Sequence, residues 1–409
     1  MKLLHTADWH LGKHLEGYSR LQEQEEFIKD LIKIVDDHKV DMILISGDIY
    51  DNFNPPAAAE KLYYRALNQL SKNGERIICI ISGNHDSPNR LIAPSPLTCN
   101  QGIILMDRPH FEIGTGRVGQ HEIIDSGQGY LEININNENV VLMALPYPSE
   151  SRLNQALLTE GGDERKLQKS YSRKVGEIFT QLEQNCRGDT INIAMSHLFV
   201  AGGEQSESER PIQVGGGLTV NTEDLPEQSQ YTALGHLHRH QAASEGKNAY
   251  YAGSPLQYSI SERNNSKSVT LVEAGCDSEA DIERIALPNR KPIEVWEVEG
   301  IEEAVATCRK NEERPVWAYL KIKTERTLLQ SEIKEIKSIK PDILSIIPLT
   351  PDDIARESEL PDTGELNIIE LFKEYYRKTK EVEPEAEVME MFASIVNNEE
   401  DEANETGNS

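Results

Sequence analysis

The sequence predicts an α/β protein of more than one domain, and three observations support this. The chain has 409 residues, which is enough for two or three domains with a full-sized core. Strand-like apolar runs alternate with helical patterns from the N-terminus onward. Polar residues with metal-ligand chemistry come directly after several of these strands, where α/β folds build their sites.

The first part of the chain alternates strands with helices. Apolar residues in the predicted helix at 21–37 recur at helical spacing, as Phe27, Leu31, Ile34 and Val35 show. The uninterrupted apolar runs before residues 47 and 83 are typical of strands buried on both faces. Strands are therefore predicted over 1–7, 41–46 and 76–82, helices over 21–37 and 57–72, and short strands with turns over 103–145.

The middle of the chain continues this pattern and then leads into a smaller module. A helix is predicted over 164–186, a polar loop over 201–217, and strands over 190–196, 231–234, 249–252, 268–274 and 282–287. After a linker at 287–292, residues 293–347 have the pattern strand, helix, strand, helix, strand. This pattern predicts a small α/β module.

Two short amphipathic helices are predicted on either side of Pro384, followed by a disordered acidic tail. Their apolar stripes either pack within the chain or dock on a partner helix. The stripes consist of Ile368, Ile369, Phe372, Tyr375 and Tyr376 in the first helix, and of Val388, Met391, Phe392 and Ile395 in the second.

The composition is typical of a globular cytosolic protein. No apolar run approaches the ~18 residues of a membrane span, and the N-terminal stretch lacks the features of a signal peptide. The five cysteines are scattered and form no C-x-x-C pair, which fits a reducing compartment. We therefore expect a cytoplasmic protein with no membrane partner.

The net charge of −27 by itself argues against a nucleic-acid partner, because such partners bind largely through neutralised phosphates. Many of the excess acids lie in residues 351–409, but the rest of the chain is acidic too. Bound metal can offset carboxylates, a partner subunit can supply basic surface, and a salt-adapted host would give the same bias. The sequence leaves these three explanations open.

Two nucleotide-binding motifs are excluded. A G-x-G-x-x-G pattern occurs at Gly114, Gly116 and Gly119, but a strand-like run follows it where a dinucleotide site requires a helix. There is no Walker A loop, so this chain is not expected to bind ATP by that route.

Seven candidate metal ligands stand at the ends of five predicted strands. They are Asp8 and His10 in "HTADWHLG", Asp48 in "LISGDIYD", Asn84 in "IISGNHDSP", His197 in "AMSHLF", and His236 and His238 in "YTALGHLHRH". A carboxylate, amide and imidazole set without thiolate suits Mn²⁺, Fe²⁺ or Zn²⁺. Any one member alone is better explained as a turn aspartate or a core histidine, whereas the ordered set indicates a metal site.

Two ions explain the set better than one. Seven ligands exceed the need of a single ion, and a bridging carboxylate at Asp48 would give each of two ions four protein ligands. In an extended segment, His236 and His238 would point to the same face. Two metals about 3.5–4 Å apart clamp the attacking and leaving oxygens of a phosphoryl displacement.

The ordered motifs resemble the calcineurin-like metallophosphoesterase superfamily. Within it, "TADWHLG", "SGDIYD", "SGNHDSPNRL", "MSHLFVAGGEQSESERPIQVGG", "ALGHLHRHQ" and "YAGSPLQYSISE" are similar to the bacterial nuclease subunits of the SbcCD type. The resemblance implies an αββα sandwich of two mixed sheets flanked by helices. It also implies Mn²⁺-dependent DNA cleavage, as a 3′→5′ double-strand exonuclease and single-strand endonuclease, by a homodimer that joins an SbcC-type coiled-coil ATPase in a heterotetramer at the nucleoid.

The resemblance also implies a role for each site residue. One ion would bind Asp8, His10, Asp48 and His238, and the other would bind Asp48, Asn84, His197 and His236. His85 would stabilise the phosphorane and protonate the leaving 3′ oxygen, which suits an imidazole with an ordinary pKa of about 6.5. Asp86 would orient His85.

Four further residues have two explanations each. Asp51 stands where relatives often carry a second catalytic histidine, so it either orients a ligand or has no chemical role. His240 is either a bystander or a support for the ligands. Lys13 and Arg90 adjoin the ligand loops and either contact DNA phosphates or are solvated charges.

The expected domain order follows from the same resemblance. Residues 1–287 would form the nuclease domain, 288–350 a capping domain that contacts DNA, 351–396 a helical partner-binding segment, and 397–409 a disordered tail. The alternative is another calcineurin-like phosphoesterase, such as a protein phosphatase or a cyclic-nucleotide phosphodiesterase. A scaffold with a relic site is a non-enzymatic alternative. The extra C-terminal modules and "GSPLQYSISE" favour the nuclease.

Overall fold

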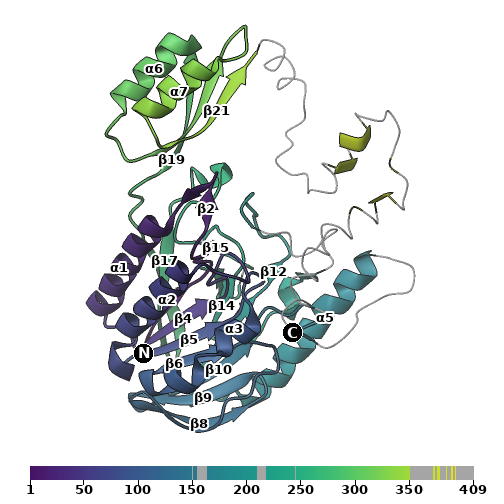
Figure 1. The fold of residues 1–409 in the computed structure, drawn as a ribbon. Coiled ribbons are helices and arrows are strands. Elements are labelled where there is room, and N and C mark those ends of the chain that lie inside the picture. Colours follow the sequence, from purple (N-terminus) through teal and green to yellow (C-terminus); the bar gives the residue numbers. More distant parts are fainter. Residues whose placement is uncertain are drawn as a thin grey trace, which may run out of the picture.

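A computed structural model describes residues 1–149, 151–153, 164–209, 218–244 and 246–350, with nine further residues between 372 and 392. Two β-sheets lie face to face, and helices cover their outer faces (Figure 1). This arrangement confirms the predicted αββα sandwich. Among the described residues, no helix combines the length and apolar character needed to cross a membrane.

The first sheet has six strands in the order β18-β17-β1-β4-β5-β6. Strands β1, β4, β5 and β6 are parallel to one another, and β17 pairs antiparallel with β1. Helices α1 (Leu21–Asp37) and α2 (Ala57–Leu70) pack on its outer face through Phe27, Leu31 and Leu67. The strands are β1 (Lys2–Thr6), β4 (Met42–Ser46), β5 (Ile77–Ile81), β6 (Ile103–Met106), β17 (Ser268–Gly275) and β18 (Ser278–Ala286).

The second sheet has eight strands in the order β15-β16-β14-β11-β10-β9-β8-β7, with β10, β11, β14 and β16 parallel. Helix α5 (Glu164–Leu182) covers its outer face through Val175 and Phe179. The strands are β7 (Gly116–Val118), β8 (His121–Gly127), β9 (Tyr130–Ile135), β10 (Glu138–Leu145), β11 (Ile191–His197), β14 (Tyr231–Gly235), β15 (Gln241–Ala242) and β16 (Ala249–Tyr251).

The inner faces of the two sheets form one apolar core. Leu44 and Ile81 from the first sheet pack there with Leu142 and Met195 from the second. Strands such as β4 and β11 are buried along their whole length, which explains why their sequences are continuously apolar. This core holds the ends of strands from both sheets in fixed positions.

Several small elements differ from the sequence expectations. Strand β18 begins at Ser278, four residues before its predicted start, because it extends a hairpin from β17 as an exposed edge strand rich in polar residues. Helix α2 ends at Leu70 and not at 72. The sequence did not predict α3 (Pro88–Ile92), α4 (Ser95–Thr98), the paired β12 (Phe199–Val200) and β13 (Thr219–Val220), or the paired β2 (His14–Leu15) and β3 (Tyr18–Ser19).

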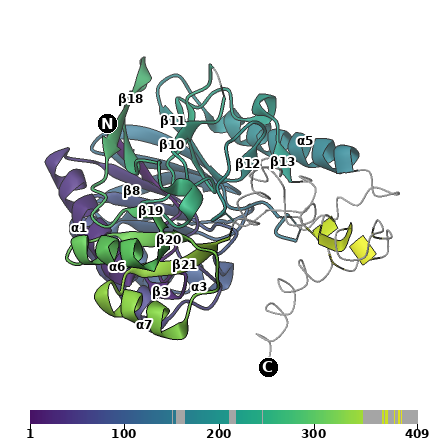
Figure 2. The same cartoon turned by 90° about the horizontal axis from the view of Figure 1, so that it is seen from above.

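The α/β module at residues 293–349 has the predicted order of elements. Its three parallel strands lie in the order β19-β20-β21, and α6 and α7 pack on one face through Ala304, Cys308 and Ile336. Viewed from above, the module lies on the side of the sandwich that carries α1 (Figure 2). The elements are β19 (Ile293–Glu299), α6 (Gly300–Lys310), β20 (Trp317–Lys323), α7 (Gln330–Ile339) and β21 (Ile343–Leu349).

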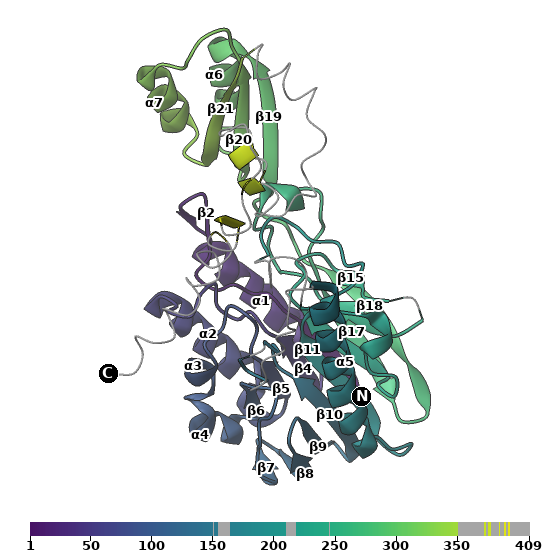
Figure 3. The same ribbon diagram turned by 90° about the vertical axis from the view of Figure 1, so that its right-hand side faces the viewer.

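The β2–β3 hairpin extends from the sandwich toward this module (Figure 3) and packs against it. Leu15 and Tyr18 of the hairpin pack against Trp317 of the module, and the Tyr18 and Trp317 ring centroids are 5.3 Å apart. The Tyr319 hydroxyl also donates to Glu16 Oε1 at 3.1 Å. Because the hairpin starts four residues after His10, the module is anchored beside the loop that carries two predicted ligands.

The predicted C-terminal helices lie mostly outside the described residues. The described positions 372–373, 375–377, 388–389 and 392 are helical. The rings of Phe372 and Phe392 stack with centroids 3.8 Å apart, so these two members of the predicted apolar stripes contact each other. Tyr375 is 64% exposed.

Candidate metal centre

The carboxyl ends of five strands bring the seven predicted ligands together. Strands β1, β4 and β5 contribute from one sheet, and β11 and β14 from the other, so the site lies where both sheets end. Six of the ligand side chains are buried, and Asn84 is partly exposed. The six buried ligands are Asp8, His10, Asp48, His197, His236 and His238.

One group of ligands forms around His10. Its Nε2 atom lies 3.0 Å from Nε2 of His238 and 3.7 Å from Oδ2 of Asp48. Ligand atoms of Asp8, His10 and His238 all lie within 4.8 Å of one another. Asp8 is held by the His236 backbone N–H, which donates to Oδ1 at 3.0 Å. The four side chains predicted for the first ion therefore lie near one another, and Asp8 also lies near Asp48 and His197.

The other group forms around His197. Its Nε2 atom lies 2.9 Å from Asn84 Oδ1 and 3.5 Å from Asp48 Oδ2, and its Nδ1 atom lies 2.9 Å from the Ser46 carbonyl. His236 Nδ1 lies 3.4 Å from the same Asn84 oxygen. Because the Ser46 carbonyl can only accept, the Nδ1–H of His197 donates to it, and Nε2 is the atom that faces Asn84 and Asp48.

Asp48 stands between the two groups. The same oxygen, Oδ2, faces Nε2 of His10 at 3.7 Å and Nε2 of His197 at 3.5 Å. Its other oxygen accepts the His85 backbone N–H at 2.9 Å, which fixes the carboxylate orientation. This geometry fits a carboxylate shared by two ions.

The backbone of the site is strained. Asp8, His10, Asp48 and His236 all have a positive φ, at 53°, 45°, 49° and 108°. Non-glycine residues rarely adopt this conformation, and it concentrates at functional sites, where surrounding structure enforces it. Four of the seven predicted ligands share this feature.

Glycines in the ligand motifs allow the close approach of the strand ends. A Cβ on Gly235 would lie 1.8 Å from the Ser46 carbonyl oxygen. A Cβ on Gly47, which has a φ of 87°, would lie 2.4 Å from His197 Nδ1. The "SGD" and "LGH" motifs therefore need glycine before the ligand because a side chain would push the two sheets apart.

The expectation that His236 and His238 share a face of an extended strand is wrong. Strand β14 ends at Gly235, and His236 has a φ of 108°. The chain turns here, so each imidazole reaches a different part of the site: His238 approaches His10, and His236 approaches Asn84. The i, i+2 spacing results from a turn and not from strand alternation.

The pKa values of the two buried carboxylates, Asp8 and Asp48, shift in opposite directions. Burial raises the pKa of Asp8 to about 7, against the opposing effect of His197 and His238. Burial also pushes up the pKa of Asp48, but the nearby His197 and His85 outweigh it and hold that pKa well below its usual range. For His197, burial lowers the pKa but the Asp48 charge outweighs it and raises the pKa to about 9.

The residues fit divalent ions. Asp8 Oδ2 and His236 Nε2 are buried and have no hydrogen-bond partner among the described residues. The Nε2 atoms of His10 and His238 face each other at 3.0 Å, so their lone pairs converge where a cation would accept both. Such a charge would also compensate the buried Asp8 and Asp48 carboxylates.

His85 lies beside the two groups and is held by the backbone. Its Nδ1 atom is 2.7 Å from the Asp51 carbonyl, and its Nε2 atom is 3.9 Å from Asp48 Oδ2. The sequence predicted Asp86 as the group that orients this ring. In the structure, the Asp86 carboxylate accepts the backbone N–H groups of Gly83, Ile49 and Tyr50 at 2.9, 3.2 and 3.0 Å, so it fixes the loop that carries His85.

Asp51 also contacts a predicted ligand. Its Oδ1 atom lies 3.6 Å from His10 Nδ1 and accepts Lys13 Nζ at 2.8 Å. Lys13 is therefore paired within the site, while Arg90 is exposed and pairs with Glu60 at 2.9 Å. His240 lies against Tyr250, outside the ligand set.

The sequence analysis missed a group of residues that surrounds His238. They are Ser208, Glu209, Glu262 and Lys267. It also missed Arg152, whose guanidinium donates to Ser82 Oγ and to the carbonyls of Gly83 and Asp86. Polar residues in loops give no periodic signal, so only the quoted stretches "SESER" and "YSISE" marked the positions of three of them.

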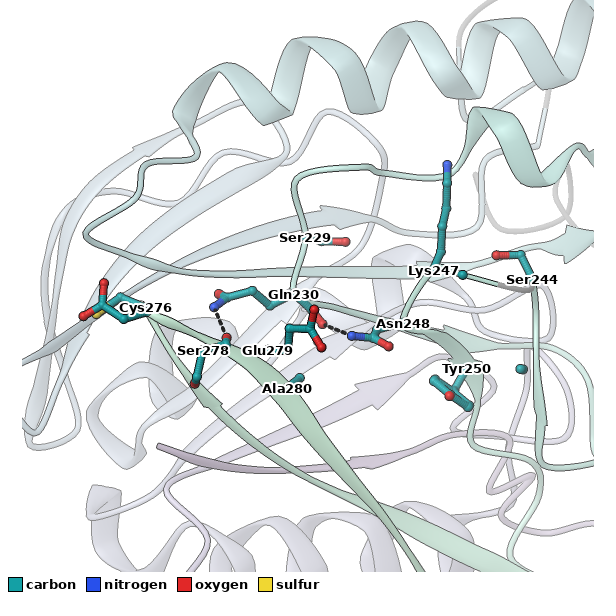
Figure 4. A pocket seen from close by; sticks show the side chains of 13 residues that line it. Ser229, Gln230, Ser244, Lys247, Asn248, Tyr250, Cys276, Ser278, Glu279 and Ala280 are labelled. Atoms are coloured by element: carbon teal, nitrogen blue, oxygen red, sulfur yellow. Dashed lines mark hydrogen bonds between the residues drawn. The ribbon is translucent and has the colours of Figure 1, made fainter.

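A large open hollow lies away from this site (Figure 4). It measures about 970 Å³ and is lined by Ser229 and Gln230 just before β14, by residues 242–250 around the β15–β16 turn, and by residues 276–280 around the β17–β18 turn. None of the seven predicted ligands lines it. Its polar groups bind one another: Gln230 Nε2 donates to the Ser278 carbonyl at 3.1 Å, and Asn248 donates to the Gln230 carbonyl at 3.2 Å. Lys247 donates to the carbonyls of Glu223 and Leu225.

Comparison with known proteins agrees with this geometry. The model of the calcineurin-like phosphoesterase family matches residues 1–240, which is more than half of the chain. The chain therefore belongs to the calcineurin-like phosphoesterases. Within them it groups with the SbcD nucleases of SbcCD complexes, to which it is similar almost from end to end.

Three relatives show this similarity. The SbcD protein of nuclease SbcCD from Bacillus subtilis is 38% identical over 98% of this chain and 99% of the relative. The SbcD protein from Rhodobacter capsulatus is 33% identical over 67% of this chain and 66% of the relative. That of Staphylococcus epidermidis is 30% identical over 91% of this chain and 92% of the relative.

Proposed function

We propose that this chain is the nuclease subunit of an SbcCD-type complex and hydrolyses DNA phosphodiester bonds with two divalent ions, most suitably Mn²⁺. The observation that carries the proposal is the meeting of seven buried or partly buried ligands at five strand ends, with Asp48 Oδ2 facing both groups. The similarity to an SbcD nuclease across 98% of the chain supports the choice of DNA over other phosphoesters.

Asp8, His10, Asp48 and His238 would hold one ion, and Asp48, Asn84, His197 and His236 the other. When bound, the two ions supply positive charge that activates water and polarises the phosphodiester. Oxygen and imidazole ligands without thiolate are compatible with Mn²⁺.

His85 would act as the proton donor to the leaving 3′ oxygen. Its Nδ1–H donates to the Asp51 carbonyl at 2.7 Å, which leaves Nε2 directed toward the ligand groups. Nε2 is then the atom that carries and releases the proton. Asp86 holds the loop through three backbone N–H groups, so the imidazole is fixed before substrate arrives.

The proposed substrates are DNA ends, hairpins and single strands, cut by 3′→5′ exonuclease and single-strand endonuclease activity. The proposed partner is an SbcC-type coiled-coil ATPase, bound by residues 351–396, with two copies of this chain in a heterotetramer at the nucleoid of the cytoplasm. The α/β module, anchored beside the His10 loop, is the proposed capping domain that contacts DNA. Lys13 and Arg90 are candidate phosphate contacts near the site.

A substrate comparison tests the proposal. The chain is incubated with Mn²⁺ and either linear duplex DNA, hairpin-ended duplex or p-nitrophenyl phosphate, with and without the ATPase partner. We expect cleavage of DNA that is lost on chelation, and ATP-dependent processing of hairpin ends only when the partner is present. Efficient hydrolysis of p-nitrophenyl phosphate without DNA cleavage would instead indicate a monoester phosphatase.

A further inference from the structure

We propose that Ser208 and Glu262 are positioning residues that keep the His238 proton on Nδ1 and so reserve Nε2 for a metal ion. This inference rests on the proposed metal site and adds residues that no ligand motif contains. Ser208 lies in the loop at 201–209, and Glu262 follows strand β16 in the turn at Ile260–Glu262. Both reach the side of His238 that faces away from His10.

The three side chains form a short chain of hydrogen bonds. Ser208 Oγ lies 2.5 Å from His238 Nδ1 and 2.5 Å from Glu262 Oε1. Glu262 is fully buried, and its other oxygen pairs with the ammonium group of Lys267. Lys267 also donates to the His238 carbonyl at 2.9 Å and to Ser254 Oγ at 2.8 Å, so the buried carboxylate is fixed in place.

When His238 is neutral, the donors and acceptors of these hydrogen bonds favour one proton arrangement, in which Ser206 Oγ, 2.9 Å from Ser208 Oγ, donates to that oxygen. Glu262 is ion-paired and can only accept, so the single hydroxyl proton of Ser208 goes to Glu262. The Ser208 oxygen must then accept a hydrogen bond from His238, which places the imidazole proton on Nδ1. Nε2 is left with a lone pair, and this is the atom that faces His10 Nε2 at 3.0 Å.

The loop at 201–209 is fastened on both sides of Ser208. Glu209 Oε1 accepts the His238 backbone N–H at 2.7 Å, and the Glu207 backbone N–H donates to Ser261 Oγ at 3.1 Å. These bonds connect the loop to the ligand segment and to the turn that carries Glu262. The loop is therefore held where Ser208 reaches His238.

Groups that orient a metal-binding histidine commonly change metal affinity by about 10–100-fold when they are removed. Ser208→Ala removes the acceptor for the imidazole proton. Glu262→Gln introduces an amide that donates to Ser208, so the hydroxyl proton turns toward His238 and favours the tautomer protonated on Nε2. The Glu262 variant should therefore weaken metal binding and also move the proton.

The experiment uses the full chain and two measurements. Titration calorimetry with Mn²⁺ alone gives the number and affinity of bound ions. Nitrogen-15 NMR of histidine-labelled, metal-free protein gives the His238 tautomer, assigned with a His238→Gln variant. Ser208→Thr keeps the hydroxyl and serves as the conservative variant. Glu204→Gln alters an exposed carboxylate of the same loop that pairs with Arg239, and serves as the matched control.

We expect wild type, Ser208→Thr and Glu204→Gln to bind two ions with similar affinity and to keep His238 protonated on Nδ1. Ser208→Ala should bind one ion about 10–100-fold more weakly, and Glu262→Gln should also shift the tautomer to Nε2. Unchanged affinity in Ser208→Ala, or wild-type His238 protonated on Nε2, would overturn the inference. Absence of Mn²⁺ binding by wild type would instead overturn the proposed function, while the tautomer in metal-free protein still tests the positioning role.

Discussion

The acidic side chains of the metal centre and those of the α/β module meet different partners. In the centre, the buried Asp8 and Asp48 face histidines, and buried nitrogen and oxygen atoms are left without partners among the described residues. In the module, carboxylates pair with Lys and Arg on the surface: Lys323 lies 2.7 Å from Glu299, and Arg326 lies 2.5 Å from Glu332. Both regions are rich in acids, but the two carboxylates among the predicted ligands, Asp8 and Asp48, lie against histidines and not against Lys or Arg.

This difference distinguishes carboxylates that can bind metal from carboxylates that only contribute to the surface charge. Buried carboxylates are stable only beside a compensating positive charge, and the proposed ions would supply that charge to Asp8 and Asp48. Exposed pairs such as Lys323–Glu299 contribute little and are screened by salt. The overall charge of −27 therefore says little about the site. In the module, the basic residues of β20 lie opposite acidic residues of β19, as Lys321 does opposite Glu297.

The largest expected effect is that of removing the proposed proton donor. His85→Ala should lower kcat by about 10²–10⁴-fold, the usual contribution of general acid–base catalysis, while two ions stay bound. Single-turnover cleavage of DNA and metal analysis by mass spectrometry measure both quantities. His240→Ala, which alters a nearby histidine outside the ligand set, is the control. Loss of metal, or cleavage close to wild type, would contradict the assigned role.

Truncation after Leu360 should separate partner binding from cleavage. All proposed ligands precede residue 239, so Mn²⁺-dependent cleavage of single strands should persist. Binding to the SbcC-type partner should weaken at least about 100-fold, as expected when the aromatic anchors of an interface are lost. A chain that lacks only 397–409 is the control and should bind normally. Co-purification of the chain truncated after Leu360 with the SbcC-type partner at full yield would show that residues 361–396 are not the docking element.

Trp317→Ala should weaken the packing of the module on the β2–β3 hairpin without changing the amount of bound metal. Its ring is 5% exposed, packs on Tyr18 and donates to Glu23 at 3.0 Å. Removing a buried tryptophan typically costs about 3–5 kcal/mol. Hydrogen exchange should increase in β19–β21 and in the β2–β3 hairpin, with metal content unchanged. Leu329→Ala, at a 57% exposed position of the module, is the control. Equal exchange in both variants would show that Trp317 does not hold the module.

The smallest effect concerns Glu332 on the module surface. The Arg326 guanidinium and the Leu329 backbone N–H lower the pKa of this carboxyl from about 4.5 to about 2. Because the folded pKa is depressed, its stabilising contribution is present above about pH 4.5 and is lost as the pH falls toward 2. Carboxyl carbon NMR should give this midpoint, rising toward 4.5 in about 1 M salt. A titration midpoint of Glu332 that does not change with salt concentration would show that solvent does not screen the Arg326–Glu332 pair.

The sequence predicted the parts of the fold that have a regular period. Helix α1 matches its predicted range, and buried strands such as β4 are evident as apolar runs. Motif order also picked out the seven candidate ligands, whose side chains the structure brings together. The hairpin β2–β3 was missed because two-residue strands have no measurable period.

The supports of the ligands were not predictable in the same way. Ser208 and Glu262 reach His238 from segments 30 and 24 residues away, through contacts that only the folded chain creates. The turn at His236 was also missed, because alternation in the sequence does not reveal where a strand ends. Candidate metal ligands at strand ends can be recognised in a sequence, whereas the residues that orient them cannot.

The central claim is that one carboxylate, Asp48, serves two ions. Metal stoichiometry by mass spectrometry tests it on the wild type, Asp48→Asn and Asp8→Asn, purified side by side. We predict two bound ions in the wild type, loss of both in Asp48→Asn, and a smaller loss in Asp8→Asn, since Asp8 belongs to one proposed set. Two tightly bound ions in Asp48→Asn would contradict the shared site.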